Sequence, residues 1–254
     1  MTKEIKAFLE TIKAHPIFEQ YPFYFVGGTA LSAYLNHRVS YDIDIASTGK
    51  LPVSAIKAFA FSLGARAIPD KNAAAFRINT GDDIENYHLK FMVDGIKLEF
   101  SYFRSPLQSA ILENAGSKPY DDVSTLKILD LNDIIALKIF ALFNRQKTRD
   151  LFDASIILEK NLLDIGELER IYSYVREGNN SIRDYIASFK AMDDDGDNSL
   201  DFLAEHEHYK TFAKKSQNER FIHAKTMFLE QYDQKQKETL VAIKKTAVRH
   251  KRER

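Results

Sequence analysis

The sequence predicts an α+β protein whose second half is helical. Two apolar-rich runs, Tyr87–Val93 and Ile96–Phe103, flank an Asp94-Gly95 pair, which is a strong local signal for a β-hairpin. After about residue 124, apolar residues recur at the spacing of amphipathic helices, and strand signals fade. We therefore expect an α+β core over residues 1–125 and a helical domain over residues 126–254.

Helices and strands are expected to alternate through the first half. The first helix is predicted because Ile5, Phe8, Leu9 and Ile12 fall on one helical face. Gly27-Gly28 then ends a short apolar run that is typical of a buried strand. Before the hairpin, the predicted elements are helices at Thr2–His15, Thr29–Asn36 and Val53–Leu63 and strands at Phe23–Val26, Val39–Ile45 and Ala74–Ile78.

The second half is expected to contain helices alone. Their predicted ranges are Leu131–Phe143, Thr148–Lys160, Ile165–Glu177, Ile182–Ala191 and Phe221–Ala247. Between the last two helices, Asp193–Ala204 resembles a calcium-binding loop, but it has Asn198 at the sixth position and Ala204 at the twelfth. Calcium loops carry Gly and a bidentate Glu at those positions, so an acidic loop between helices is the favoured interpretation.

Composition excludes several classes of protein. The 254 residues include no cysteine, which rules out disulfides, zinc–thiolate sites, iron–sulfur clusters and thiol nucleophiles. The longest apolar runs fall well short of the roughly 18–20 residues needed to cross a bilayer. We therefore expect a cytoplasmic protein without a membrane partner.

Charge balances over the whole chain but not locally. The 36 basic and 36 acidic side chains cancel, which argues against a protein that simply coats DNA. The last stretch, Ala242–Arg254, is nonetheless strongly basic. It is either a solvated helix end that frays or a surface that faces a polyanion.

Two aspartates form the most informative pattern in the chain. Asp42 and Asp44 are two apart on a predicted strand, so both carboxylates project to the same side. Like charges held so close raise each other's pKa unless a cation lies between them. Oxygen ligands of this kind suit Mg²⁺, and Glu99 on the polar face of the hairpin could supply a third carboxylate.

The Gly27-Gly28 pair is expected to approach a phosphorylated ligand. It lies where a strand turns into a helix, and glycine lets the backbone come close to a ligand. A helix N-terminus offers unpaired N–H donors and partial positive charge, which together favour phosphate. Ser40 lies two residues before Asp42, where its hydroxyl either braces the turn or contacts a phosphate.

The combination of Gly-Gly, a short helix and Asp-x-Asp resembles the signature of the DNA polymerase β-like nucleotidyltransferase fold, whose core has a mixed sheet. In its finer form, Gly27–Leu31 followed by His37–Asp44 is similar to the AbiEii/AbiGii (MenT-like) nucleotidyltransferase toxins. These are toxin halves of bacterial toxin–antitoxin and phage-defence pairs. The resemblance implies transfer of NMP from an NTP, with release of pyrophosphate, to an RNA such as a tRNA 3′ end, which blocks translation. It also implies a cognate antitoxin protein as partner.

A second block, Lys138–Asp153, is similar to the family's helical lysine followed by Arg-Asp-x-x-Asp. Lys138 is the basic residue of a largely apolar helix, so its ammonium must reach solvent, a carboxylate or a phosphate. The resemblance implies that Lys138 and Asp150 are catalytic and that Arg149 binds nucleotide. Arg149 and Asp153 are four apart on a helix and could instead pair with each other.

The implied reaction is nucleotidyl transfer through metal-bridged phosphates. Asp42, Asp44 and Glu99 would hold Mg²⁺, as a two-metal site, with Glu99 at the acceptor metal or acting as base. Gly27, Gly28, Thr29, Ser40 and Arg149 would bind the nucleotide. Two other interpretations stay open: transfer to a small molecule or protein, and nucleotide binding without catalysis.

Overall fold

The chain forms two compact units, Met1–Leu137 and Lys138–Arg254. The computed structural model describes residues 1–176, 180–191 and 200–252, the last six as backbone alone. A division into domains at 1–125 and 126–254 stays a prediction. Helix α7 (Leu131–Asn144) begins in the first unit and continues into the second.

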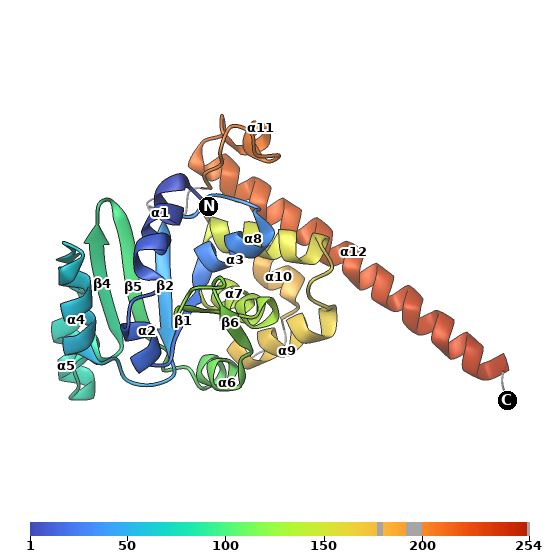
Figure 1. Ribbon diagram of the computed structural model, residues 1–254. Helices are drawn as coiled ribbons and strands as arrows, with labels where there is room; N and C mark the ends of the chain where they lie inside the picture. Colours follow the sequence, from blue (N-terminus) through green and yellow to red (C-terminus); the bar gives the residue numbers. More distant parts are fainter. Residues whose placement is uncertain (177–179, 192–199, 253–254) are drawn as a thin grey trace. The chain divides into compact units, whose positions relative to one another are not determined.

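The described residues of the first unit build one seven-stranded mixed sheet in the order β3-β4-β5-β2-β1-β7-β6. Its strands are β1 (Phe23–Val26), β2 (Asp42–Ser47), β3 (Arg66–Ala67), β4 (His88–Val93), β5 (Ile96–Tyr102), β6 (Ser117–Pro119) and β7 (Lys127–Leu129). β2 pairs in parallel with β5 and antiparallel with β1, and Figure 1 shows these strands side by side. The predicted α+β fold with a mixed sheet is confirmed.

Local sequence accounts for the elements around the sheet. Helix α1 (Lys3–Ile12) starts where the Thr2 side chain accepts a hydrogen bond from the Ile5 N–H, and its apolar face is buried as predicted. The β4–β5 hairpin turns through Asp94 and Gly95, both with positive φ, as its Asp-Gly pair predicts. The other helical elements of this unit are α2 (Ile17–Gln20), α3 (Gly27–Leu35), α4 (Val53–Ser62), α5 (Ala73–Thr80), the 3₁₀ turn η1 (Ile84–Asn86) and α6 (Pro106–Asn114).

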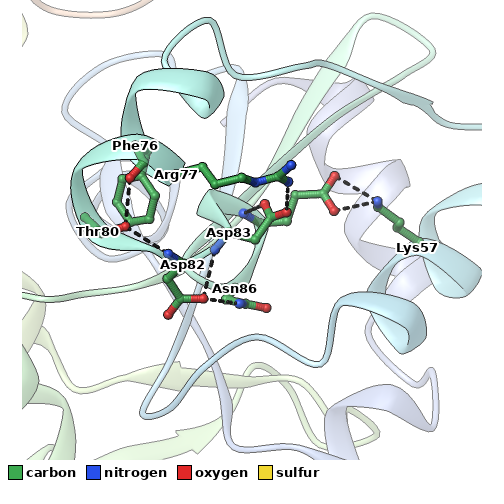
Figure 2. A network of polar contacts seen from close by, with 8 residues as sticks. Lys57, Phe76, Arg77, Thr80, Asp82, Asp83 and Asn86 are labelled. Carbon is green, nitrogen blue, oxygen red and sulfur yellow. Dashed lines mark hydrogen bonds and ion pairs between the residues drawn. The ribbon is translucent and has the colours of Figure 1, made fainter.

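One predicted strand is wrong: Ala74–Ile78 lies inside helix α5. Three consecutive alanines, the residues of highest helix propensity, open this segment. Gly81, with a φ of 70°, closes it by donating its N–H to the carbonyl of Arg77. Figure 2 shows the polar contacts around the C-terminal end of α5. The side chain of Asp82 accepts a hydrogen bond from the Asn86 amide, and Arg77 forms an ion pair with Asp83.

Other boundaries also differ from expectation. β2 begins at Asp42 rather than at Val39, because its pairing with β5 starts with Asp42 opposite Lys97, one residue after β5 begins, and its pairing with β1 starts at Asp44, opposite Val26. No local signal indicates β6 and β7, which are three residues each and too short to show alternation. β7 pairs in parallel with β1, so the sheet continues past residue 124.

The second unit is helical in its described residues, as predicted. Its helices after α7 are α8 (Thr148–Glu159), α9 (Ile165–Val175), α10 (Ile182–Ala187), α11 (Tyr209–Phe212) and α12 (Gln217–Arg252). α8 is buried along nearly its whole length and packs against the first half of α12. Most of the segment 193–204 lies outside the described residues. That it is an acidic loop between helices rather than a calcium-binding loop therefore stays a prediction. No helix within the described ranges is both long and apolar enough to cross a membrane.

Candidate active site

Strands β2 and β5 carry the predicted carboxylates on one face of the sheet. Their parallel register sets Asp44 opposite Glu99 and Asp42 opposite Lys97. Because side chains at alternate positions share a face, all four polar side chains project together from the sheet. Lys97 joins two of the acids: its Nζ lies 3.2 Å from Asp42 Oδ2 and 2.9 Å from Glu99 Oε1.

Glu99 is held as a carboxylate by two neighbours. Its side chain is 17% exposed, and its Oε2 lies 3.1 Å from His88 Nε2 on β4. Burial alone would raise the pKa of Glu99, but the hydrogen bond with His88 and the charge of Lys97 outweigh burial and hold the pKa at about 2. The second ring nitrogen of His88 lies 3.8 Å from Asp70 Oδ2.

Gly27 brings the start of α3 directly against Asp44. A Cβ built on Gly27 would lie 1.9 Å from Asp44 Oδ2, and Gly27 has a φ of 77°. Glycine alone adopts that φ without strain and leaves the space that the carboxylate fills. The predicted close approach of backbone at the Gly-Gly turn is therefore present, and in this structure Asp44 is what occupies it.

Gly28 stands against two buried polar side chains. A Cβ there would lie 2.7 Å from Arg38 Nη2 and 3.1 Å from Ser40 Oγ. Arg38 also donates from Nη1 to the carbonyl of Val39. Thr29 is fully buried and donates its hydroxyl to the backbone carbonyl of Asp42, which ties α3 to the start of β2.

The carboxylate face fits a hard divalent cation in its chemistry. Its donors are carboxylate oxygens, and a cation, the Lys97 ammonium, already lies between Asp42 and Glu99. As the side chains stand, the described residues contain no group of three or more His, Cys, Asp or Glu placed to hold a metal ion. The ligand set Asp42, Asp44 and Glu99 stays a prediction.

In the second unit, Lys138 of α7 lies in a buried ion cluster with α8. Its Nζ is 3.0 Å from Asp153 Oδ2 and 3.6 Å from Asp150 Oδ1, and its side chain is 8% exposed. The ammonium of Lys138 was expected to reach solvent, a carboxylate or a phosphate, and the structure shows that it contacts carboxylates. The role of Lys138 in catalysis stays a prediction.

Asp150 is completely buried beside positive charge. Arg145 binds it through two nitrogens, with Nε at 2.7 Å from Oδ2 and Nη2 at 3.2 Å from Oδ1. Burial would raise the pKa of Asp150, but Lys138 and Arg145 overcome burial and lower it. Asp153 forms an ion pair with Lys138. The role of Arg149 in nucleotide binding stays a prediction.

Three residues at the site were not predicted from the sequence: Lys97, His88 and Arg38. The alternation of the hairpin strand already put Lys97 on the polar face with Glu99, which is a usable signal. His88 faces Glu99 because the antiparallel hairpin register sets it opposite Ser101, two residues further along β5. Arg38 lies within the His37–Asp44 block that resembles the family, but only the fold shows that it reaches Gly28.

The sheet and its carboxylate face agree with the class of protein that the motifs predict, a nucleotidyltransferase. The chain belongs to the AbiEii nucleotidyltransferase toxin family: a family model described as "Nucleotidyl transferase AbiEii toxin, Type IV TA system" matches residues 8–238. The family resemblance drawn from the two sequence blocks is thereby confirmed.

Individual relatives are distant. An uncharacterized protein of Aquifex aeolicus is 30% identical over 149 residues. The match covers 59% of this chain and 64% of the relative, so the chain spans less than two thirds of the length of that relative. Among solved structures, a candidate nucleotidyltransferase from H. pylori has a TM-score of 0.46 at 16% identity, covering 93% of this chain and 98% of that one. MenT4, a nucleotidyltransferase toxin from Mycobacterium tuberculosis, has a TM-score of 0.42 at 12% identity, covering 83% and 74%.

Proposed function

We propose that the protein is a Mg²⁺-dependent nucleotidyltransferase toxin that transfers NMP from an NTP to RNA, with a tRNA 3′ end as acceptor. Transfer would block translation, and a cognate antitoxin protein would restrain it in the cytoplasm. Membership of the AbiEii family supports this proposal. The observation that carries it is the carboxylate face of β2 and β5, set against the Gly-Gly start of α3.

The first unit supplies the groups for phosphate and metal. Gly27, Gly28 and Thr29 at the start of α3 would bind the triphosphate through backbone N–H groups, with Ser40 beside them. Asp42, Asp44 and Glu99 would hold the divalent ion. When bound, such an ion neutralises phosphate charge and lowers the pKa of an acceptor hydroxyl.

Glu99 is better suited to bind a cation than to accept a proton. A carboxylate with a pKa of about 2 is a weak base near neutral pH. His88 and Lys97 keep it ionised, which is what a metal ligand requires. We therefore assign Glu99 the role of a ligand of the divalent ion.

In the second unit, Lys138 and Arg149 would contact nucleotide phosphates, as the family resemblance implies. Asp150 would act by orienting the cations that it binds, since Arg145 and Lys138 both lie against its carboxylate. Its burial leaves no side-chain oxygen exposed to the solvent.

A transfer assay tests this function. The purified chain would be incubated with each α-labelled NTP, Mg²⁺ and total RNA, and label would be followed in RNA, protein and small-molecule fractions. We expect label in tRNA, lost in Asp42→Asn and Asp44→Asn but kept in the matched surface variant Asp94→Asn, which lies in the hairpin turn. Label in protein or in small molecules would refute the RNA acceptor, and nucleotide binding without label transfer would refute catalysis.

A further inference from the structure

Lys97 occupies the space between two proposed metal ligands. It lies directly across the β2–β5 ladder from Asp42 and two residues before Glu99, so its side chain shares their face of the sheet. Its Nζ is 3.2 Å from one carboxylate and 2.9 Å from the other, and its side chain is 18% exposed. The register of the sheet, rather than a chance rotamer, therefore brings the ammonium to these acids.

We propose that Lys97 is a built-in counter-ion that occupies the divalent-ion site until nucleotide arrives. This inference rests on the proposed function. In the metal-free protein the ammonium joins Asp42 and Glu99. When a metal–NTP complex binds, the ammonium leaves the carboxylates and pairs with the triphosphate.

Electrostatics gives the reason for such an exchange. A divalent ion and an ammonium repel each other, so they cannot both lie against the same two carboxylate oxygens. Bare metal must therefore displace Lys97 without offering it a new anion, which weakens metal binding. A metal–triphosphate complex brings phosphate oxygens with it, so the displaced ammonium keeps an anionic partner. Metal and nucleotide should thus bind with positive coupling through this one side chain.

A neighbouring lysine provides a matched control. Lys90 lies on β4 directly opposite Glu99 and is also partly buried, but its Nζ is 3.9 Å from Asp70. Removing its charge changes the net charge of the same sheet face by the same amount. It should therefore report the long-range electrostatic effect without the local exchange.

The test measures Mn²⁺ binding to the full chain by calorimetry, with and without a non-hydrolysable NTP. Without nucleotide, Lys97→Met should bind Mn²⁺ about 10-fold more tightly than wild type, since one cation no longer competes. Lys90→Met should stay within about 3-fold, and Lys97→Arg, which keeps the charge, should bind as weakly as wild type. With nucleotide present, the advantage of Lys97→Met should shrink, because only wild type gains the lysine–phosphate pair.

Lys97→Gln is measured alongside Lys97→Met, so that one neutral variant is still available if the other fails to fold. Circular dichroism shows which of the two variants is folded. Unchanged or weaker Mn²⁺ binding in a folded neutral variant would overturn the counter-ion role and leave a purely structural cross-strand pair. Asp42→Asn separates the two proposals. If that variant binds Mn²⁺ as wild type does, the metal site itself is wrong, whatever Lys97 does.

Discussion

At the scale of single residues, Gly27 couples the backbone to the chemistry of the site. Its positive φ turns the chain from β1 into α3, and its missing side chain leaves the space filled by the carboxylate of Asp44. A single methyl group at this position would therefore change both the backbone and the placement of a proposed metal ligand.

Gly27→Ala should impair both stability and transfer. The left-handed φ alone costs a non-glycine residue about 1–2 kcal/mol, and overlap with Asp44 adds to this. Denaturant unfolding should show a lower free energy of unfolding, and nucleotidyl transfer should fall on the order of 100-fold as Asp44 shifts. Gly49→Ala is the control, since nothing lies within 4 Å of a Cβ there. Equal stability and activity in both variants would contradict the close approach.

Glu99 makes stability depend on acid. Its pKa is about 2 in the folded chain against an ordinary 4.5, so it stabilises the fold fully above pH 4.5. That contribution is lost as the pH falls from 4.5 toward 2. Glu99→Gln should therefore cost about 3 kcal/mol of unfolding free energy at pH 7, and the gap to wild type should narrow below pH 4.5. Unfolding curves from pH 7 to pH 3 measure it, with exposed Glu113→Gln as control; a constant gap would contradict the prediction.

At the scale of elements, α7 and α8 are joined by buried charge. Lys138 on α7 faces Asp150 and Asp153 on α8, and both aspartates are almost fully buried. Replacing a whole buried ion pair by apolar groups can be neutral, but removing one charge of a buried cluster leaves the remaining charges less well compensated.

Lys138→Met should therefore destabilise the second unit whether or not Lys138 touches nucleotide. The expected loss is about 3–5 kcal/mol of unfolding free energy, because two buried carboxylates lose the ammonium that lies 3.0 Å from Asp153 and 3.6 Å from Asp150. The exposed pair of Arg170 and Glu167 on α9 provides the comparison, and Arg170→Met should cost under about 1 kcal/mol. Chemical unfolding followed by circular dichroism distinguishes the two, and similar losses would contradict the buried cluster.

Helices and strands could be predicted from the sequence where a local pattern was enough to specify them. The β4–β5 hairpin follows from Asp94-Gly95, and α1 follows from its apolar spacing. The prediction of a strand at 74–78 is wrong because a short run of alanines and apolar residues suits both structures, whereas the C-cap at Gly81 favours a helix. β7 depends on pairing with β1, which no local pattern encodes.

The site was predictable only in part, for the same reason. Asp42, Asp44 and Glu99 were found because alternation along a strand fixes which side chains share a face. That Lys97 contacts Asp42 depends on the parallel register of β2 with β5, two strands about fifty residues apart in the chain. Arg38 likewise reaches Gly28 only through the fold.

At the scale of the whole molecule, a chain of zero net charge must bind a polyanion through local charge. The sequence 243–254 holds six lysines and arginines and one glutamate. Within α12, every described side chain from 237 to 246 is exposed, so this part of the helix supports no core. Of the two interpretations of the basic end, a surface for RNA is the one that the proposed acceptor favours.

Deleting residues 243–254 should therefore weaken RNA binding and leave folding unchanged. Because the deletion removes up to six basic groups that can neutralise phosphates, the slope of log affinity against log salt should become shallower by about 2–4. Filter binding of labelled tRNA at several salt concentrations measures the slope, and thermal unfolding should give the same midpoint as the full chain.

A full-length variant with all six basic residues changed to glutamine is the matched control, since it keeps the length and removes the charge. The residues to change are Lys244, Lys245, Arg249, Lys251, Arg252 and Arg254. If charge rather than length carries RNA binding, this variant should show the same shallow slope as the deletion. Equal slopes for wild type and both variants would mean that the basic end is a solvated tail, and the RNA surface would then have to lie elsewhere on the chain.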